Sequence, residues 1–434
     1  MTSERTASEG PADPRDDASG DHAVDSGDQP VAPLLRAPAD GTPDPLTTPA
    51  ELARAAAGLA AGHGPVAVDA ERASGYRYSQ RAYLVQLRRA GYGTVLIDPI
   101  ALPDLSSIDS ALAGAEWILH AATQDLSCLA EVGMRPRRLF DTELAGRLLG
   151  SERVALGTMV EQYLGISLEK GHSAADWSTR PLPADWLNYA ALDVELLIEL
   201  REVLVAELAR TGKLGWAEQE FSAILDAAPP APRGDPWRRT SGIHNLRNRR
   251  QLAMVRSLWQ ARDRLAAERD VAPGRTLPDA AILAAVKASP KSRDELAAVA
   301  VFGGPRQRRL TDYWYRALAE GRETPEDQLP PLSQASTDPD AMPSPARWRD
   351  RDPAAAARLA AAKQAVTEIA TKHRLLSQNL LAGDVLRRLA WRPVTPLTEE
   401  SVRARLAELG ARPWQIDLLA ERLTAALAEP EPAG

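Results

Sequence analysis

The sequence predicts a mixed α/β domain, in which helices cover a mixed β-sheet, followed by two all-helical domains. Short runs rich in Val, Leu and Ile, each closed by Gly, Asp or Pro, occur up to about residue 122 and are typical of strands. From about residue 124 to residue 224 the pattern is helical, and this order favours a mixed sheet covered by helices. Two Pro-rich breaks then separate two further helical stretches.

The domain boundaries follow from composition. At 434 residues the chain is too long for one ordinary core, and about three domains are expected. Residues 1–48 are rich in Pro, Gly, Asp, Ser and Ala, so they cannot bury enough apolar surface to offset chain entropy and predict a disordered acidic tail. The other predicted boundaries are an α/β domain over 49–224, a linker over 225–239, a helical domain over 240–323, a linker over 324–348 and a second helical domain over 349–429.

The elements of the α/β domain can be placed in order. Residues 48–62 begin with Thr before Pro and an early Glu, which is a favourable helix start. The stretches "GPVAVDAE" (64–71) and "AYLVQLRRAGYGTVLIDP" (82–99) predict strands, and "AEWILHAA" (115–122) is a fourth apolar run. Within and just after that run, His120 and Cys128 are interpreted as core residues.

Charge is distributed unevenly along the chain. Residues 1–48 hold 10 Asp/Glu against 3 Lys/Arg, a balance of −7 that equals the net charge of the whole chain. Residues 236–323 hold 18 Lys/Arg against 9 Asp/Glu. A basic helical module is therefore expected beside an acidic remainder, and phosphate contact is a better interpretation of its arginines than a solvated surface.

Composition also bears on the compartment. The lone cysteine excludes an internal disulfide and fits a reducing environment. No apolar run approaches the ~20 residues of a membrane-spanning helix, and the N-terminus lacks the basic start and apolar centre of a secretory signal. We therefore expect a soluble, cytoplasmic protein with no membrane partner.

Acidic side chains follow two of the predicted strands. Asp69 and Glu71 lie two residues apart and therefore point to the same side of a strand. They would repel each other unless a hard cation such as Mg²⁺ or Mn²⁺ lay between them, or unless the strand has simply reached solvent. Asp125 follows a later predicted strand (115–122), where it is either a helix cap or a ligand-binding group at a strand end.

A helical stretch carries two further polar residues. Tyr189 and Asp193 lie four apart in "DWLNYAALDVELL" (185–197), so they share one helix face. Taken alone, the pair predicts a partly buried tyrosine with a solvated aspartate near it.

Taken together, D-x-E on a strand, Asp after a later strand and Y-x-x-x-D on a helix resemble the DEDD 3′–5′ exonucleases with tyrosine in the third motif. The sister subgroup has histidine five residues before the last acid, where this chain has Asn188. The segments "RAYLVQL", "FDTELAGRLLG" and "TMVEQYLGISLEKGHSAADWSTRPLP" extend the resemblance to the ribonuclease D family over about 60–225. The segment that begins "RNRRQLAMVRSLWQ" resembles the helical HRDC domain, and 350–428 resembles a second, divergent copy.

The resemblance implies an RNase H-like fold and a mechanism in which two divalent metal ions, Mg²⁺ or Mn²⁺, clamp the attacking and leaving oxygens of a phosphodiester. By this resemblance the metal ligands are Asp69, Glu71, Asp125 and Asp193. Tyr189 would orient or deprotonate the attacking water. The expected substrates are RNA 3′ ends, in tRNA precursors and other structured RNA, and the products are 5′-nucleotides released stepwise by a monomer.

The loop "GHSAADWSTRP" (171–181) offers candidates for holding the terminal nucleotide. They are His172, Trp177 and Arg180, because base–aromatic stacking contributes about 1–3 kcal/mol; a structural tryptophan is the alternative. A DNA-directed 3′–5′ exonuclease remains an alternative function, since no reader of the ribose 2′-OH is evident. A non-catalytic RNA-binding protein would not need the four acids and the tyrosine, and a helicase would need a phosphate-binding loop that the sequence lacks.

Overall fold

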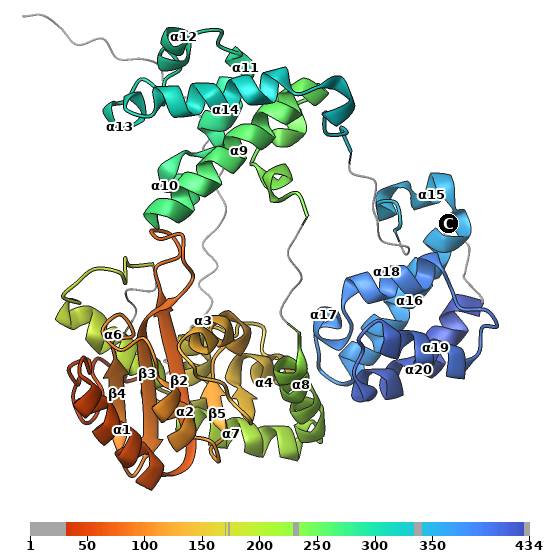
Figure 1. Cartoon of the computed structure of the whole chain (residues 1–434). Helices are drawn as coiled ribbons and strands as arrows, with labels where there is room; N and C mark the ends of the chain where they lie inside the picture. Colours follow the sequence, from red (N-terminus) through yellow and green to blue (C-terminus); the bar gives the residue numbers. More distant parts are fainter. Residues whose placement is uncertain (1–31, 170, 172–173, 229–233, 334–340, 429–434) are drawn as a thin grey trace, which may run out of the picture.

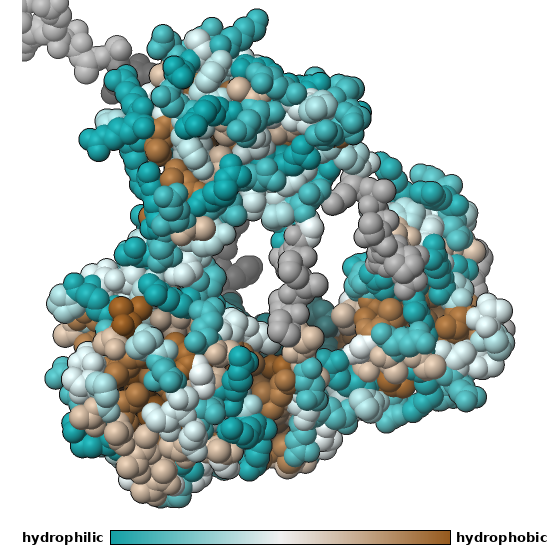
Figure 2. Space-filling model, viewed as in Figure 1, coloured by the Kyte–Doolittle hydropathy of each residue, from teal (hydrophilic) through white to brown (hydrophobic). Residues whose placement is uncertain are grey.

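The computed structural model describes residues 32–169, 171, 174–228, 234–333 and 341–428. Figure 1 shows one α/β body followed by two helical bodies, which confirms the predicted fold class. We call the helical bodies the first helical module (234–333) and the second helical module (341–428). In the same view the surface of the first helical module is mostly hydrophilic (Figure 2).

A five-stranded mixed sheet forms the centre of the α/β body. Its strands are β2 (His63–Arg72), β3 (Ala82–Ala90), β4 (Gly93–Ile97), β5 (Trp117–Leu119) and β6 (Leu139–Asp141). The spatial order is β4-β3-β2-β5-β6. The β2–β3 and β3–β4 pairs are antiparallel, whereas β2–β5 and β5–β6 are parallel. The strand that carries the D-x-E motif is therefore central, and its carboxyl end lies beside that of β5.

Helices cover the sheet, and the first begins where the sequence predicts. Thr48 and Glu51 form a reciprocal capping box at the start of α1, which explains the helix start there. Helix α6 packs across β2, β3 and β4, so its inner face lies against the strand that carries the first motif. The helices of this body are α1 (Pro49–Ala61), α2 (Ser106–Ala111), η1 (Ala122–Gln124), α3 (Leu126–Glu131), α4 (Thr142–Leu149), α5 (Leu156–Leu164), α6 (Ala184–Glu195), α7 (Leu197–Arg210) and α8 (Leu214–Asp226).

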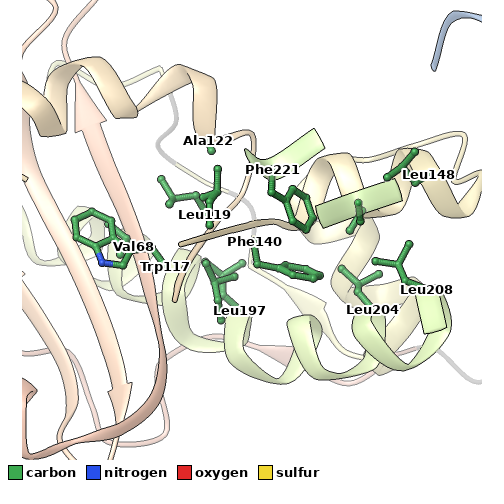
Figure 3. Packing of buried hydrophobic residues seen from close by; sticks show 14 of the residues in the cluster. Val68, Trp117, Leu119, Ala122, Phe140, Leu148, Leu197, Leu204, Leu208 and Phe221 are labelled. Atoms are coloured by element: carbon green, nitrogen blue, oxygen red, sulfur yellow. The ribbon is translucent and has the colours of Figure 1, made fainter. Parts of the chain in front are cut away.

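The core of the α/β body fills the space between the β5–β6 edge and helices α7 and α8. Figure 3 shows Leu119 of β5 and Leu204 of α7 near Phe140 of β6, whereas Trp117 lies toward Val68 of β2. The rings of Phe140 and Phe221 lie 4.9 Å apart between centroids. This packing fixes the positions of the two parallel strands whose ends face the site.

Residues 32–48 pack against the α/β body, so the prediction that a disordered tail extends to residue 48 is wrong for this part. Strand β1 (Leu34–Leu35) pairs in parallel with β7 (Ser167–Leu168). Leu46 continues the sheet beyond β4 through hydrogen bonds with the backbone of Leu96 and Asp98. Composition could not show this, because the segment is held mainly by backbone hydrogen bonds rather than by apolar burial. Residues 1–31 lie outside the described residues.

The first helical module has its own core, in which Leu258, Ile282 and Trp314 are fully buried. Trp237 is also buried in it, so the module begins within the predicted linker over 225–239. The two long helices, α9 and α14, pack along each other. Its elements are η2 (Pro236–Arg239), η3 (Ile243–Asn245), α9 (Arg249–Arg269), α10 (Pro273–Thr276), α11 (Asp279–Ala288), α12 (Arg293–Ala297), α13 (Pro305–Arg308), α14 (Thr311–Glu323) and η4 (Glu326–Gln328).

The second helical module shares its apolar core with the α/β body. Trp216 of α8 stacks on Trp414 of α20, with 4.7 Å between ring centroids. Its elements are η5 (Pro345–Arg347), α15 (Trp348–Arg351), α16 (Pro353–Lys372), α17 (Ser377–Leu380), α18 (Gly383–Trp391), α19 (Glu399–Glu408) and α20 (Pro413–Ala428). None of the described helices is long and apolar enough to cross a membrane.

Polar contacts join the first helical module to the loop that follows β2. Arg275 donates from Nε to the carbonyl oxygen of Gly75 at 2.8 Å, and its guanidinium lies 4.0 Å from the centroid of the Tyr76 ring. The backbone N–H of Ser79 donates to Asp270 at 2.8 Å. The module is therefore held next to the end of the central strand.

Candidate active site

Three acids of the sequence motifs converge where α6 crosses β2. Asp69 and Glu71 of β2 and Asp193 of α6 each contribute one carboxylate oxygen to a group whose members lie within 4.8 Å of one another. Alternation along the strand turns both β2 acids to one side, and α6 packs against that strand. Three carboxylates at this spacing suit a hard divalent cation, which prefers oxygen ligands.

A cavity of about 510 Å³ opens over these acids. The fourth predicted acid, Asp125, and the predicted tyrosine, Tyr189, also line it, so all five predicted catalytic residues face one space. The polar lining residues are Asp69, Glu71, Arg72, His120, Gln124, Asp125, Glu143, Tyr189 and Asp193.

Asp125 is presented by a turn at the end of β5. Asp141 builds that turn, because its carboxylate accepts hydrogen bonds from the backbone N–H groups of Ala121 and Ala122, at 3.2 and 2.8 Å. The Asp125 side chain makes no capping hydrogen bond at the start of α3. It forms an ion pair with Arg72 at 3.2 Å instead. The structure therefore disfavours the interpretation of Asp125 as a simple helix cap.

Burial and mutual repulsion raise the pKa values of the acids. Desolvation, followed by the charges of Asp69, Asp193 and Asp125, raises the pKa of Glu71 well above its usual value. Desolvation also raises the pKa of Asp69 and Asp193. The pKa of Asp125 rises to about 8 through desolvation and the charge of Asp69, although Arg72 opposes this. Arg72 alone does not offset burial and repulsion in this cluster, and divalent cations would supply further positive charge.

Tyr189 lies one helical turn from Asp193, as their spacing predicts. Burial raises the pKa of the Tyr189 phenol further above its ordinary value, and the charges of Asp193 and Glu71 add to this effect. The phenol is hydrogen-bonded to Asp193. At neutral pH it therefore carries its proton and can donate a hydrogen bond, which favours orientation of a water over its deprotonation.

Gln86 is a buried amide directly opposite Asp69. The two residues are paired in the register of β2 and β3, and directly paired side chains lie on the same face with Cβ atoms about 4.5–5.5 Å apart. Gln86 is 0 % exposed, and neither atom of its amide has a hydrogen-bond partner. A buried polar group without partners costs about 1–3 kcal/mol. This orphaned amide fits a site that further polar groups, such as ligand waters of a metal ion, would complete.

The structure contradicts the prediction that Trp177 and Arg180 hold the terminal nucleotide. Trp177 is 0 % exposed and packs against Trp186 and Tyr189, with ring centroids 5.4 and 6.4 Å away. Arg180 donates to both carboxylate oxygens of Asp98, at 2.7 and 2.9 Å, and to three backbone carbonyl oxygens. Both side chains are engaged within the fold, and the alternative of a structural tryptophan holds. His172 lies outside the described residues.

Sequence reasoning missed three residues of the site. Arg72 directly follows the D-x-E motif, and Gln86 is the polar residue within the apolar run "AYLVQL". His120 lines the cavity and is hydrogen-bonded through Nδ1 to Thr142 Oγ1 at 2.9 Å, so it is not simply a core residue. A polar residue inside a buried strand was the available signal for Gln86. Cys128, in contrast, is a buried residue, as predicted.

Comparisons with known proteins agree with this geometry. The model of a 3′–5′ exonuclease family matches residues 43–209, the HRDC domain matches 251–318, and a 3′ to 5′ exonuclease C-terminal domain matches 341–427. Ribonuclease D of Granulibacter bethesdensis is 32 % identical over 290 residues, which cover 65 % of this chain and 72 % of that protein. Ribonuclease D of Escherichia coli (strain K12) is 32 % identical over 272 residues, or 61 % and 71 %. For ribonuclease D of Shewanella sp. (strain ANA-3), 35 % identical over 211 residues (48 % of this chain), the match spans 54 % of that protein.

Solved structures resemble most of the chain. A protein from Bifidobacterium adolescentis superposes with a TM-score of 0.83 at 38 % identity, covering 92 % of this chain and all of the other. The structure of Escherichia coli RNase D, described as an exoribonuclease involved in structured RNA processing, gives a TM-score of 0.63 at 26 % identity over 90 % and 99 %. On the fold, the domain matches and these relatives, the chain belongs to the ribonuclease D family of 3′–5′ exoribonucleases.

Proposed function

We propose that this chain removes nucleotides one at a time from RNA 3′ ends by a two-metal mechanism, with 5′-nucleotides as products. The observation that carries the proposal is the convergence of Asp69, Glu71 and Asp193 within 4.8 Å, with Asp125 lining the same cavity. The four carboxylates are buried or half-buried and have raised pKa values, which is costly without cations, so their convergence in one cavity is best explained by metal binding.

The roles proposed for the acids come from the family resemblance, and their positions are compatible with them. Asp69, Glu71 and Asp193 would hold one Mg²⁺ or Mn²⁺ ion, and Asp69 with Asp125 would hold a second. The bound ions would supply the positive charge that stabilises the attacking and leaving oxygens and lowers the pKa of the attacking water. Arg72 keeps Asp125 directed into the cavity through the 3.2 Å ion pair.

Tyr189 would position the attacking water by donating or accepting one hydrogen bond at its hydroxyl. Because its pKa is raised, the phenol keeps its proton at neutral pH, so orientation of the water is the role we assign. The backbone restricts the ring, because a methyl group at Gly171 would lie only 3.3 Å from Cδ2 of Tyr189. Trp177 packs against the same ring, with 6.4 Å between centroids, so the direction of the hydroxyl group is restricted.

We further propose that the substrates are the 3′ ends of tRNA precursors and other structured RNA. The first helical module supports this, because its sequence from Pro236 to Glu323 holds 18 Lys/Arg against 9 Asp/Glu. It contacts the loop that follows β2, so RNA held on the module would lie close to the cavity. The description of the Escherichia coli relative as an enzyme of structured RNA processing supports the same substrate class.

Digestion of matched RNA and DNA oligonucleotides of one sequence, labelled at the 5′ end, tests the proposed function. In Mg²⁺ or Mn²⁺ we expect the RNA to shorten stepwise from its 3′ end, with release of 5′-nucleotides, and no reaction in excess chelator. Faster hydrolysis of the DNA would favour the DNA-directed alternative. Internal cleavage, or binding of RNA without hydrolysis in either ion, would contradict the proposal.

A further inference from the structure

Residues 33–42 lie across the helix that carries Tyr189 and Asp193. Asn188 is hydrogen-bonded to this segment at both ends of its amide: Nδ2 donates to the carbonyl oxygen of Arg36 at 2.7 Å. The hydroxyl group of Thr42 donates to Oδ1 of Asn188 at 2.9 Å. The residue directly before Tyr189 is therefore fixed by chain that lies more than a hundred positions away in sequence.

The same segment also contacts the C-terminal end of α6, beyond Asp193. Glu195, the last residue of α6, is 3 % exposed. Its Oε1 accepts the backbone N–H of Ala39 at 3.0 Å, and its Oε2 lies 3.0 Å from the guanidinium of Arg88 on β3. A buried carboxylate that lost one of these partners would be left partly unpaired. The segment therefore contacts α6 one residue before Tyr189 and two residues after Asp193.

A third contact leads toward Tyr189 from outside the helix. Strand β1 pairs with β7, and Ser167 and Glu169 donate their backbone N–H groups to the carbonyl oxygens of Pro33 and Leu35, at 3.0 and 3.1 Å. Strand β7 ends three residues before Gly171, which lies against the Tyr189 ring. Residues 33–42 thus anchor both α6, which bears Tyr189, and β7, which leads to Gly171 beside the Tyr189 ring.

We propose that residues 33–42 are an N-terminal strap that positions Tyr189 and Asp193 for catalysis. The inference rests on the proposed function of these two residues. None of the strap residues lines the catalytic cavity, so the strap acts through the direction of α6 and not through contact with RNA. Catalysis is sensitive to such displacement, because misplacement of a reacting group by about 1 Å can cost on the order of 10²-fold in rate.

Two truncations form a matched pair. Deletion of residues 1–31 leaves the strap intact and should leave kcat and KM at the parental values. Deletion of residues 1–42 removes the strap, and we expect kcat to fall about tenfold or more, with KM for a short RNA within about twofold. Both proteins should be assayed well below their melting temperatures, with folding checked by circular dichroism. Equal kcat for the two truncations would overturn the proposal.

Point variants keep the test valid if the longer deletion does not fold. Asn188→Leu has nearly the same shape and loses both amide hydrogen bonds, so it should lower kcat while KM stays the same. Thr42→Val should lower kcat less than Asn188→Leu does. Thr42→Ser, which keeps the hydroxyl group, should keep kcat at the parental value. Variants that lower the melting temperature while kcat remains parental would show that the strap only stabilises the fold, which contradicts positioning.

Mn²⁺ affinity gives a readout that does not depend on hydrolysis. Asp193 completes the three-acid group, so displacement of α6 should weaken Mn²⁺ binding. We expect the protein lacking residues 1–42 to bind Mn²⁺ several-fold more weakly than the protein lacking residues 1–31. If the full chain binds Mn²⁺ but hydrolyses no RNA, the proposed function fails while this difference still tests the strap. Equal Mn²⁺ affinity together with equal kcat would show that the strap does not position α6 for catalysis.

Discussion

The catalytic cavity and the first helical module both concentrate charge of one sign, but they hold it in opposite surroundings. Five carboxylates line the cavity, and Arg72 is the one lysine or arginine among the described residues that line it. In the first helical module many arginines are exposed, and others pair with acids, as Arg250 does with Glu326 at 2.9 Å. Figure 2 shows how hydrophilic the surface of the module is.

The difference separates chemistry from binding. Carboxylates with raised pKa values hold protons until metal ions displace them, so without metal they offer an RNA backbone no attraction. Exposed guanidinium groups need no partner and remain free to contact phosphate. Changes in the cavity should therefore alter turnover with little effect on RNA affinity, whereas changes in the first helical module should do the reverse.

The largest effect is expected for Asp193→Asn. This variant removes one of the three converging carboxylates, so turnover should fall on the order of 10³-fold or more, given the several kcal/mol that metal ions contribute to such reactions. RNA affinity should hardly change, since RNA binding is assigned to the first helical module. Without metal the melting temperature should not fall, because loss of a charge relieves repulsion in the cluster. Single-turnover hydrolysis and RNA binding should be measured on the same preparation.

The control for this variant lies on the same helix. Asp185→Asn changes an exposed acid in the first turn of α6 and should hydrolyse RNA at the parental rate. Parental turnover by Asp193→Asn would mean that the three acids are not the site of reaction, and the separation of chemistry from binding would fail.

The next largest effect is expected for Tyr189→Phe. Loss of a hydroxyl group that positions water should lower kcat on the order of 10²-fold, while RNA affinity stays the same. Tyr163→Phe is a matched control, since that hydroxyl lies 3.1 Å from Ser151 Oγ and away from the cavity. Because the pKa of Tyr189 is raised, we also expect no fall or rise in rate from its ionisation below about pH 10. A loss of stability with unchanged turnover would assign Tyr189 to packing.

A smaller effect is expected when charge is removed from the first helical module. Replacing the exposed Arg306, Arg308 and Arg309 by Ala should weaken RNA binding on the order of tenfold at low salt. Each lost phosphate contact flattens the slope of log K against log salt by about 0.7 on a single strand, so the three together would flatten it by up to about 2. Turnover of a short oligonucleotide at saturation should not change.

The second helical module supplies the control for charge. Arg347, Arg349 and Arg351 are likewise three exposed arginines within a short segment, and their replacement by Ala should change the slope less. Deleting both modules would be a poorer test, because the stacked pair Trp216 and Trp414 lies in a core shared with the α/β body. Equal slopes for parental protein and both triple variants would show that these arginines form only a solvated surface.

The smallest effect is expected in thermal stability as pH and metal are varied. The pKa of Asp125 is about 8 in the folded protein and about 3.9 in an unfolded chain. The folded state therefore holds the extra proton between these values, and without metal its stability should fall as pH rises from about 4 to 8. Bound Mn²⁺ requires ionised acids, so the increase in melting temperature with Mn²⁺ should grow from pH 6 to pH 8.

The size of this increase in melting temperature can be estimated. At an ion concentration of 100 Kd the stabilisation is about 2.7 kcal/mol, which corresponds to several degrees. The increase should be smaller in Asp193→Asn and unchanged in Asp185→Asn. An increase that is independent of pH, or equal in both variants, would place the bound ions outside the acid cluster.

The catalytic residues could be predicted from sequence because local geometry determines which of them share a face. Alternation along β2 pairs Asp69 with Glu71, and the four-residue helix spacing pairs Tyr189 with Asp193. Loop and strap residues could not be predicted in this way. Arg180 was expected at the substrate but is held by Asp98, 82 positions away, and a tertiary contact of that kind leaves no local pattern. Likewise, the strap is held by backbone groups and by Asn188, which composition does not reveal.

Sulfur substitution at the scissile linkage tests most directly whether the reaction at the acid cluster uses two metal ions. In an RNA whose terminal 3′-bridging oxygen is sulfur, a metal ion that contacts the leaving atom should bind it poorly when the ion is Mg²⁺ and better when it is the softer Mn²⁺. We therefore predict that sulfur slows hydrolysis at least tenfold more in Mg²⁺ than in Mn²⁺, relative to the oxygen substrate in each ion. An equal sulfur effect in the two ions would show that no metal ion stabilises the leaving group and would contradict a two-metal reaction at the acid cluster.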